Sequence, residues 1–423
     1  MLIVIPKESQ HGETRVAASP ETVKKLVKQG HQVRVQSSAG LAATWSDRDY
    51  LAAGASIGDE TTSMYSDAAL ILKVLAPNTQ EIALYPAHAA LVCLFDIHRY
   101  PHLGLLAAKQ IDAFALELIP RISRGQSMDV LSSQANIAGY RAVLLATHYF
   151  PRFMPMLMTA AGSVKPARVL ILGAGVAGLQ AIATAKRLGA VVEVFDVRPA
   201  TREQVESLGA KFVEVELSSE EQAAFAHTGG YAKEMSDDYR QRQSELIAQQ
   251  AAQADIIIST ALIPGKAAPI LLTAATVARM KAGSVIIDMA VSHGGNCPLS
   301  QVDQVVISDN GVSIVGQSNL AALMPTDASS MFARNVLTFL ALLVDKDANY
   351  APQQGDEIVQ ATRVCHAGSI YFASASAGFA AQVTAAQSSQ TSAVPATADA
   401  ITTDDITADA NTADVITADA ITA

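Results

Sequence analysis

The sequence predicts an α/β protein with two doubly wound parallel-sheet domains, a cleft between them and a disordered C-terminal tail. Three observations lead to this fold class. Short apolar runs alternate with helical patterns along most of the chain, a glycine-rich turn separates one such run from a helix, and a five-residue repeat begins at Thr397. Alternating strands and helices are typical of parallel sheets whose two faces are covered by helices.

The first series of strands and helices begins at the N-terminus. Residues 2–5 are predicted as a strand, Ser19 and Pro20 begin a helix that Gly30 ends, and residues 32–35 form the next strand. Further apolar runs predict strands at residues 69–74, 90–95 and 111–118. A long helix predicted at 329–344 would pack back on this unit. We therefore expect a first domain of residues 1–135 with 320–384.

The second series contains the most specific motif. A strand at residues 168–172 is followed by Gly173-Ala174-Gly175-Val176-Ala177-Gly178, a helical run to residue 188 and a strand at 191–195 that ends in Asp196. The three glycines permit a tight turn, a close approach to a pyrophosphate and close packing of helix on strand. The N–H groups that begin the helix attract phosphates. The turn predicts a Rossmann-like dinucleotide domain at residues 136–319, with further strands at 211–215, 255–259, 284–289 and 312–315.

Asp196 bears on the choice of nucleotide. It lies eighteen residues after Gly178, where a carboxylate can accept hydrogen bonds from an adenosine ribose. The same carboxylate would repel a 2′-phosphate, which favours NAD over NADP. Arg198 weakens this discrimination because a neighbouring cation could attract that phosphate.

A polar loop, RISRGQSMDVLSSQ, occupies residues 121–134 between a predicted strand and a helical pattern beginning near Asn136. Loops at the ends of strands are where α/β folds place ligand contacts. An ordinary polar surface turn is the alternative interpretation, and the glycine turn downstream favours a binding loop. Its hydrogen-bonding side chains are Arg121, Arg124, Gln126, Asp129, Ser132 and Ser133.

Composition excludes several classes of function. The chain has 423 residues, half of them hydrophobic, and a net charge of −10, which argues against nucleic acid or an anionic membrane surface as a direct partner. Cys93, Cys297 and Cys365 are far apart and lack metal-ligand spacing, so we predict no metal site and a reducing compartment. The N-terminus is predicted as a strand and not a signal peptide. No apolar run reaches the ~18 residues of a membrane helix, so we expect no direct membrane insertion.

The C-terminal tail differs in kind from the rest of the chain. Its five-residue units carry mostly alanine where a stacked β-solenoid would carry large apolar residues. A few such units cannot bury a core. We predict that residues 385–423 are a disordered, mildly acidic tail.

Together, residues 1 to about 380 resemble the alanine dehydrogenase/transhydrogenase superfamily. Within it, they are most similar to the NAD(H)-binding component, domain I, of proton-translocating NAD(P) transhydrogenases. The matching motifs are the loop RISRGQSMDVLSSQ, the helix NIAGYRAV, the fingerprint GAGVAGLQAIATAKRLGA, and the segments GGYAKEM, TALIPGK and GGNCPLS. The chain departs from the pattern after Asn319, where Leu-Ala-Ala-Leu replaces a Pro-Ser-Arg stretch, and at 291–293.

The resemblance implies a function and roles for individual residues. Hydride would pass directly between NAD(H) bound here and NADP(H) bound by a partner subunit. The residues implied in catalysis are Gln126, Arg121, Asp129 and Ser132. Those implied in cofactor binding are Arg121, Ile122, Ser123, Arg124, Gln126, Ser127, Met128, Asp129, Ser132, Gly173, Ala174, Gly175, Val176, Gly178, Asp196, Val197, Arg198, Gly230, Tyr231, Gln243 and Leu262. Of these, Gly230 and Tyr231 would belong to a lid that closes over the nucleotide.

The resemblance also implies partners. These are an NADP-binding beta subunit, a membrane-spanning subunit that couples the reaction to proton movement, and a second copy of this chain. Since the chain stops before any membrane helix, we expect these parts to be separate polypeptides. The expected location is cytoplasmic, peripheral on the inner face of the bacterial plasma membrane.

Two other functions remain open from the sequence. A soluble NAD-dependent alanine dehydrogenase would need an acid–base histidine and cations that bind a carboxylate. Arg15 and Lys73 lie where that family has its cations, but the histidine motif is absent, and we expect His98 to lie on a surface loop. The third possibility is an NAD-binding regulatory module without catalysis. The sequence does not identify it by any motif of its own.

Overall fold

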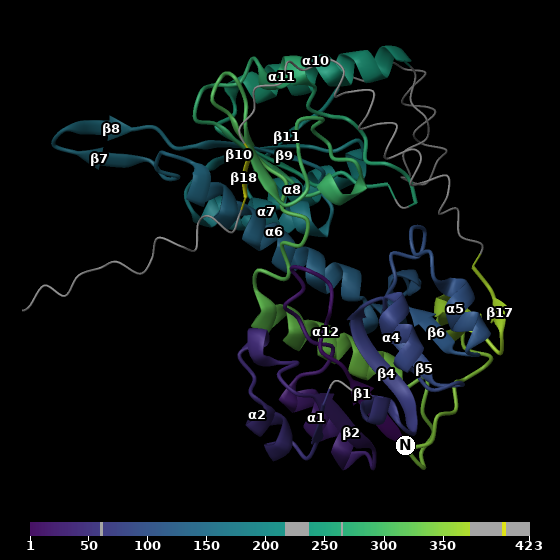
Figure 1. The fold of residues 1–423 in the computed structure, drawn as a ribbon. Helices are drawn as coiled ribbons and strands as arrows, with labels where there is room; N and C mark the ends of the chain where they lie inside the picture. The colour runs from purple at the N-terminus through teal and green to yellow at the C-terminus, as the bar shows by residue number, and fades with distance from the viewer. Residues whose placement is uncertain (60–61, 216–236, 264, 373–399, 403–423) are drawn as a thin grey trace, which may run out of the picture.

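The computed structural model describes residues 1–59, 62–215, 237–263, 265–372 and 400–402, which form two lobes (Figure 1). Each lobe is built around an eight-stranded sheet, and a two-stranded hairpin extends from the second lobe. The helices α6 (Val130–Tyr149) and α12 (Pro325–Leu340) lie where the lobes meet. The predicted α/β class with two doubly wound sheets is confirmed.

The first sheet has the strand order β17-β16-β6-β5-β4-β1-β2-β3. Strands β1 to β6 are parallel, and β16 and β17 are added antiparallel at the β6 edge. The order reverses between β1 and β4, which is where doubly wound sheets open a crevice. The strands are β1 (Leu2–Ile5), β2 (Gln32–Gln36), β3 (Ser56–Gly58), β4 (Ala68–Leu75), β5 (Ala90–Leu94), β6 (Asp112–Ala115), β16 (Arg363–His366) and β17 (Ser369–Ile370).

Short helices connect these strands. The first begins as the sequence predicts, because the Ser19 hydroxyl accepts a hydrogen bond from the backbone N–H of Thr22 and Pro20 occupies the first turn. The helices are α1 (Pro20–Lys28), α2 (Asp47–Ala52), α3 (Thr62–Tyr65), α4 (Thr79–Leu84), α5 (Leu103–Ala108) and α13 (Glu357–Thr362), with the 3₁₀ turns η1 (Leu41–Ala43), η2 (Leu116–Leu118) and η3 (Ser123–Met128).

The second sheet has the order β11-β10-β9-β12-β13-β15-β14-β18. Its order reverses between β9 and β12, on either side of the glycine-rich turn. The strands are β9 (Arg168–Leu172), β10 (Val191–Phe195), β11 (Lys211–Val213), β12 (Ile256–Ser259), β13 (Val285–Asp288), β14 (Gln304–Ile307), β15 (Ser313–Val315) and β18 (Ala400–Thr402). Its helical segments are α7 (Val176–Arg187), η4 (Pro199–Thr201), α8 (Arg202–Ser207), α10 (Asp237–Gln253), α11 (Ala274–Val277) and η5 (Val291–His293).

Helix α6 belongs to the cores of both lobes. Val130, its first residue, and Met128, just before it, pack with the first sheet. Ala142 and Ala146, later in the helix, pack with the second sheet and α7. Helix α12 packs its buried aromatic residues, such as Phe332, into the first core. The relative placement of the two lobes therefore depends on these two helices.

A hairpin of β7 (Leu157–Thr159) and β8 (Gly162–Val164) projects from the second lobe (Figure 1). It and the segment before it expose large apolar side chains. Met158 is 75% exposed, Met156 62% and Phe153 58%. Such exposure is unusual for a surface that contacts only water.

The structure differs from the sequence prediction at several places, such as the long helix predicted at 329–344, which is α12 at Pro325–Leu340. The strand predicted at 111–118 ends at Ala115 and continues as η2. Helix α6 begins at Val130 and not near Asn136, because the Asp129 side chain caps it. Of the tail predicted to be disordered, the structure describes only Ala400–Thr402, which form edge strand β18 with Ile401 opposite Val305. In the described part of the chain, no helix is long and apolar enough to cross a membrane.

Candidate nucleotide-binding site

The glycine-rich turn has the geometry of a phosphate-binding site. Gly173 adopts φ +103°, which favours glycine. A Cβ on Gly178 would lie 1.9 Å from the Gly173 carbonyl oxygen, so α7 packs directly on the turn. Gly175 precedes α7 without a side-chain cap, and a Cβ there would meet no atom within 4 Å. The turn therefore leaves open space in front of uncapped N–H groups, which fits the pyrophosphate of a dinucleotide.

Asp196 lies at the end of β10, beside this turn. Its carboxylate is buried and accepts a hydrogen bond from the Ala174 N–H at 2.7 Å. Arg198 donates to the same carboxylate through its backbone N–H at 2.8 Å, its Nε at 2.9 Å and its Nη2 at 2.8 Å. The hydrogen bonds that Arg198 donates to Asp196 raise the pKa of Arg198, although partial burial opposes the shift. The carboxylate is thus fixed beside the turn and forms an ion pair with Arg198.

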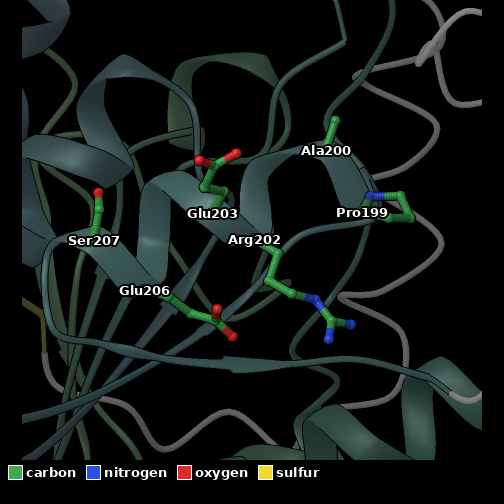
Figure 2. Close-up of a pocket in the computed structure, with 6 residues that line it drawn as sticks. All are labelled: Pro199, Ala200, Arg202, Glu203, Glu206 and Ser207. Carbon is green, nitrogen blue, oxygen red and sulfur yellow. The ribbon is translucent and has the colours of Figure 1, made fainter.

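A hollow lies on η4 and α8, the segments that follow Arg198 in the chain (Figure 2). Figure 2 shows the residues that line it. Pro199 and Ala200 of η4 are apolar, and the residues from α8 have polar side chains. Rossmann-type sheets hold the adenosine end of a dinucleotide beyond the second strand, past the carboxylate. The residues that line the hollow come directly after the second strand and its carboxylate in the chain.

The loop that follows β12 is bound to the glycine turn. The Thr260 N–H donates to the Leu172 carbonyl at 2.8 Å, and the Thr260 hydroxyl donates to the Gly173 carbonyl at 3.1 Å. Further along, the fully buried Asn296 donates to the carbonyls of Ala261 at 2.9 Å and Pro269 at 2.8 Å. Leu262, which lies between these anchors, is 48% exposed. The strand ends therefore bring Leu262 to the same edge of the sheet as Gly173 and Asp196.

The polar loop at residues 121–134 reaches α6 through η3. The Asp129 carboxylate accepts hydrogen bonds from the Ser132 N–H at 2.9 Å and the Ser132 hydroxyl at 2.6 Å. Asn335 on α12 donates to the Ser127 carbonyl at 2.8 Å, which holds η3 against that helix. Asp129 and Ser132 therefore form a fixed pair at the N-terminus of α6.

The remaining predicted residues of this loop differ in their surroundings. Arg121, Ser123, Gln126 and Ser127 are exposed, Ile122 is half-buried, and Met128 is buried in the first core. Arg124 makes an ion pair of 2.5 Å with Asp356, the N-cap of α13, and this pairing lowers the pKa of Asp356. The Arg124 charge therefore stabilises the attachment of the loop to α13.

The other predicted residues lie elsewhere or outside the described chain. Val176 is 37% exposed at the start of α7, and Val197 is half-buried between Asp196 and Arg198. Gln243 lies in α10, whose buried residues pack on the opposite face of the sheet from α6 and α7. Its place in the pocket stays a prediction. Gly230 and Tyr231 lie outside the described residues.

A buried ion network that the sequence did not reveal lies where β1 and β4 of the first sheet end. Lys73 on β4 is 1% exposed, and its Nζ lies 3.1 Å from Glu8 and 2.7 Å from Glu81. Burial disfavours its charge, but the attraction of Glu8 and Glu81 is stronger, so the pKa of Lys73 is raised. Two of the three N–H donors of Lys73 are therefore engaged by carboxylates of the chain.

Arg15 is engaged in the same way. Its Nη2 lies 2.6 Å from Glu13, and its Nη1 donates to the Gln134 side-chain oxygen on α6 at 2.8 Å. Glu13 also accepts from Asn319 at 2.9 Å, and Gln134 donates to the Ala328 carbonyl at 3.0 Å. This network joins the first lobe, α6 and the start of α12. Sequence reasoning named Arg15 but not its partners, because nothing in the spacing of residues 13, 134 and 319 indicates contact.

A second contact between the lobes involves His98, which was expected on a surface loop. Its ring packs against Phe372 at 5.2 Å, and a Cβ on Gly265 of the second lobe would lie 3.0 Å from its Cε1. Arg99 donates to the Ser292 carbonyl at 2.9 Å. His98 thus lies in a turn after β5, as expected, but its side chain is half-buried because this turn packs against the second lobe.

Comparisons with known proteins agree with this architecture. The alanine dehydrogenase/PNT N-terminal domain matches residues 4–138, and the alanine dehydrogenase/PNT C-terminal domain matches residues 142–373. An NAD(P) transhydrogenase alpha subunit of Rhodospirillum rubrum is 51% identical over 377 residues, 88% of this chain and 97% of that protein. The crystal structure of transhydrogenase from Sinorhizobium meliloti is similar with a TM-score of 0.79 and 44% identity, covering 88% of this chain and 100% of that one. The alanine dehydrogenase of Halomonas elongata is 28% identical over 397 residues, 92% of this chain and 99% of that protein.

Proposed function

The chain belongs to the alanine dehydrogenase/PNT family, and on this premise we propose that it is the NAD(H)-binding subunit of a proton-translocating transhydrogenase. Hydride passes directly between NAD(H) on this chain and NADP(H) on a partner subunit. A separate membrane subunit couples the transfer to proton movement. The chain itself works on the cytoplasmic face of the bacterial plasma membrane, where it is held by these partners.

The observation that carries this proposal is that the structure has two groups of candidate nucleotide contacts, here called half-sites, which α6 connects. The glycine turn and Asp196 supply contacts for the pyrophosphate and the adenosine ribose. The Asp129–Ser132 pair at the start of α6 supplies hydrogen-bonding groups for the nicotinamide end, with Arg121 and Gln126 exposed beside it. Both half-sites are needed to bind and orient one dinucleotide.

The chemistry of the site suits hydride transfer without proton transfer. A nicotinamide supplies the hydride at its C4 position, and no alkoxide or amine forms that would need a proton. The residues of this chain then have to bind, orient and exclude water. Asp129 serves as a positioning group, because its two oxygens accept the Ser132 N–H and hydroxyl. Gln126 is exposed on η3, and we propose that it faces the incoming NADP-binding subunit.

The alternative of a soluble alanine dehydrogenase has less support from the structure. Such an enzyme needs free cations for the substrate carboxylate, and both Lys73 and Arg15 are paired with buried carboxylates. A substrate carboxylate would therefore compete with these carboxylates for the same cations. The identity to the H. elongata alanine dehydrogenase is also much lower than that to the R. rubrum transhydrogenase subunit.

A second copy of this chain is the expected partner of the β7–β8 hairpin. Its exposed Met156, Met158 and the preceding Phe153 form an apolar arm that extends beyond the lobe. Burial of such side chains contributes about 1.5–3 kcal/mol each. We expect Met158→Ser to shift the chain from dimer to monomer in sedimentation analysis.

Reconstitution tests the proposed function. The full chain is mixed with a purified NADP(H)-binding transhydrogenase subunit, NADPH and an NAD analogue, and the reduction of the analogue is followed by absorbance. We expect turnover that requires both proteins. Turnover with pyruvate, ammonia and NADH by this chain alone would support the dehydrogenase instead, and binding of NADH without any turnover would support the regulatory module.

A further inference from the structure

The motif NIAGYRAV, in the middle of α6, contains none of the residues proposed to contact the nucleotide. Its Gly139 is buried, and a Cβ at this position would lie 2.1 Å from the carbonyl oxygen of Ala177 and 2.9 Å from its Cα. Real Cβ atoms essentially never approach this closely. Ala177 is the second residue of α7, directly after the glycine-rich turn. Helix α6 therefore touches the backbone of the phosphate-binding end of α7.

We propose that Gly139 is a positioning residue that sets the spacing between the two halves of the nucleotide site. The proposal rests on the proposed function and deepens it. Helix α6 carries the Asp129–Ser132 pair at its start and contacts α7 at Gly139, seven residues after Ser132. Seven residues of α-helix span about 10 Å. Because this stretch is rigid, the place where α6 meets α7 fixes where the nicotinamide contacts lie relative to the pyrophosphate turn.

An alanine at residue 139 could not be accommodated by a side-chain rotation, because the obstructing atoms are backbone. Helix α7 has no room to move onto the turn either, because the two already pack so closely that a Cβ on Gly178 would lie 1.9 Å from the Gly173 carbonyl oxygen. The later part of α6 is fixed through Ala142 and Ala146 in the second core. The N-terminal part of α6 therefore has to tilt away, and it takes Asp129 and Ser132 with it. A displacement of about 1 Å at a reacting centre can reduce a rate on the order of 10²-fold.

The test is Gly139→Ala in the full chain, with Gly104→Ala as the matched control. Gly104 lies in α5, and a Cβ there meets no atom within 4 Å. Two ligands distinguish the contributions of the two half-sites to binding. ADP-ribose lacks the nicotinamide and contacts only the turn and Asp196, whereas NADH contacts both. Dissociation constants come from calorimetry, and the rate of hydride transfer comes from stopped-flow mixing with the NADP(H)-binding subunit.

We expect the affinity of Gly139→Ala for ADP-ribose to stay within about threefold of the parent, while hydride transfer at saturating NADH falls at least ~10-fold. Gly104→Ala should match the parent in both. Equal hydride-transfer rates for Gly139→Ala and the parent would overturn the proposal. An equal loss of affinity for ADP-ribose and NADH would also overturn it, because the contact would then shape only the phosphate turn.

If Gly139→Ala does not fold, as judged by circular dichroism, Ala142→Gly provides the second variant. It removes a buried methyl group from the same core and loosens α6 instead of displacing it. We expect several-fold slower hydride transfer with ADP-ribose affinity retained, and an unchanged rate would again overturn the proposal. Failure of the proposed function is distinguishable, because then the parent itself would transfer no hydride.

Discussion

Replacing Asp196 tests the adenosine half of the site. Its carboxylate accepts four hydrogen bonds, one from Ala174 in the glycine turn and three from Arg198. Asp196→Ala removes the acceptor for the ribose, leaves the Ala174 N–H without its partner and frees a guanidinium beside the turn. A hydrogen bond to a charged group contributes roughly 1.5–3 kcal/mol.

This free energy sets the expected loss of NADH affinity. Since each 1.4 kcal/mol is tenfold, NADH should bind Asp196→Ala roughly 10- to 150-fold more weakly than the parent. The affinity for NADPH should change in the opposite direction, because the carboxylate no longer repels the 2′-phosphate and the freed Arg198 attracts it. Asp196→Asn is the matched variant. It keeps an acceptor for the Ala174 N–H but lacks the charge, so it should lose less NADH affinity and still gain NADPH affinity.

The assay is titration calorimetry of the three proteins with NADH and NADPH at one ionic strength. Circular dichroism checks that each variant is folded. Equal NADH dissociation constants for Asp196→Ala and the parent would remove Asp196 from the site. A fall in NADPH affinity in both variants would refute the reasoning about charge.

Four other changes have defined expected outcomes. Lys73→Met should lower the free energy of unfolding by about 3–5 kcal/mol in urea titrations, because it leaves Glu8 with a buried, unpaired charge; a loss below about 1 kcal/mol would contradict the network. The pKa of Glu21 is lowered to about 2 by hydrogen bonds from Lys25 and Arg334, so the stability that Glu21→Gln removes should be present above pH 4.5 and vanish as the pH falls toward 2. A pH-independent difference in melting temperature would argue against this ion pair. Gln126→Asn should slow hydride transfer on the order of 10²-fold with little change in NADH affinity, and an undiminished rate at saturating nucleotide would exclude its role. Truncation after Gln387 should leave the melting temperature and NADH affinity unchanged, and a clear drop would show that β18 stabilises the second sheet.

The sequence predicted the elements whose signals are local. Strand β9, the glycine turn and Asp196 were found because tight turns, uncapped helix ends and buried strands each need particular residues at short spacing. The start of α6 was misplaced, although Asp129 is a standard N-cap residue, because the whole loop was assigned to ligand binding. The polar side chain at Asp129 does both: it caps the helix and belongs to the candidate site.

The features that the sequence could not show depend on contacts between distant residues. Arg15 and Gln134 are 119 positions apart, and Lys73 meets Glu8 where β1 and β4 of the first sheet end. The importance of Gly139 depends on a carbonyl group in another helix, and a single glycine in a helical pattern has no signal for this. These residues influence the site because the fold buries them against distant neighbours, which their residue types do not indicate.

The most direct test of the central claim follows the hydride itself. NADH carrying deuterium at the transferable C4 position is mixed with the full chain, a purified NADP(H)-binding transhydrogenase subunit and NADP⁺, and the products are analysed by mass spectrometry. We expect one deuterium in each NADPH formed, and no labelled NADPH when either protein is omitted. NADPH without deuterium, or deuterium released to water, would contradict direct transfer between the two nucleotides.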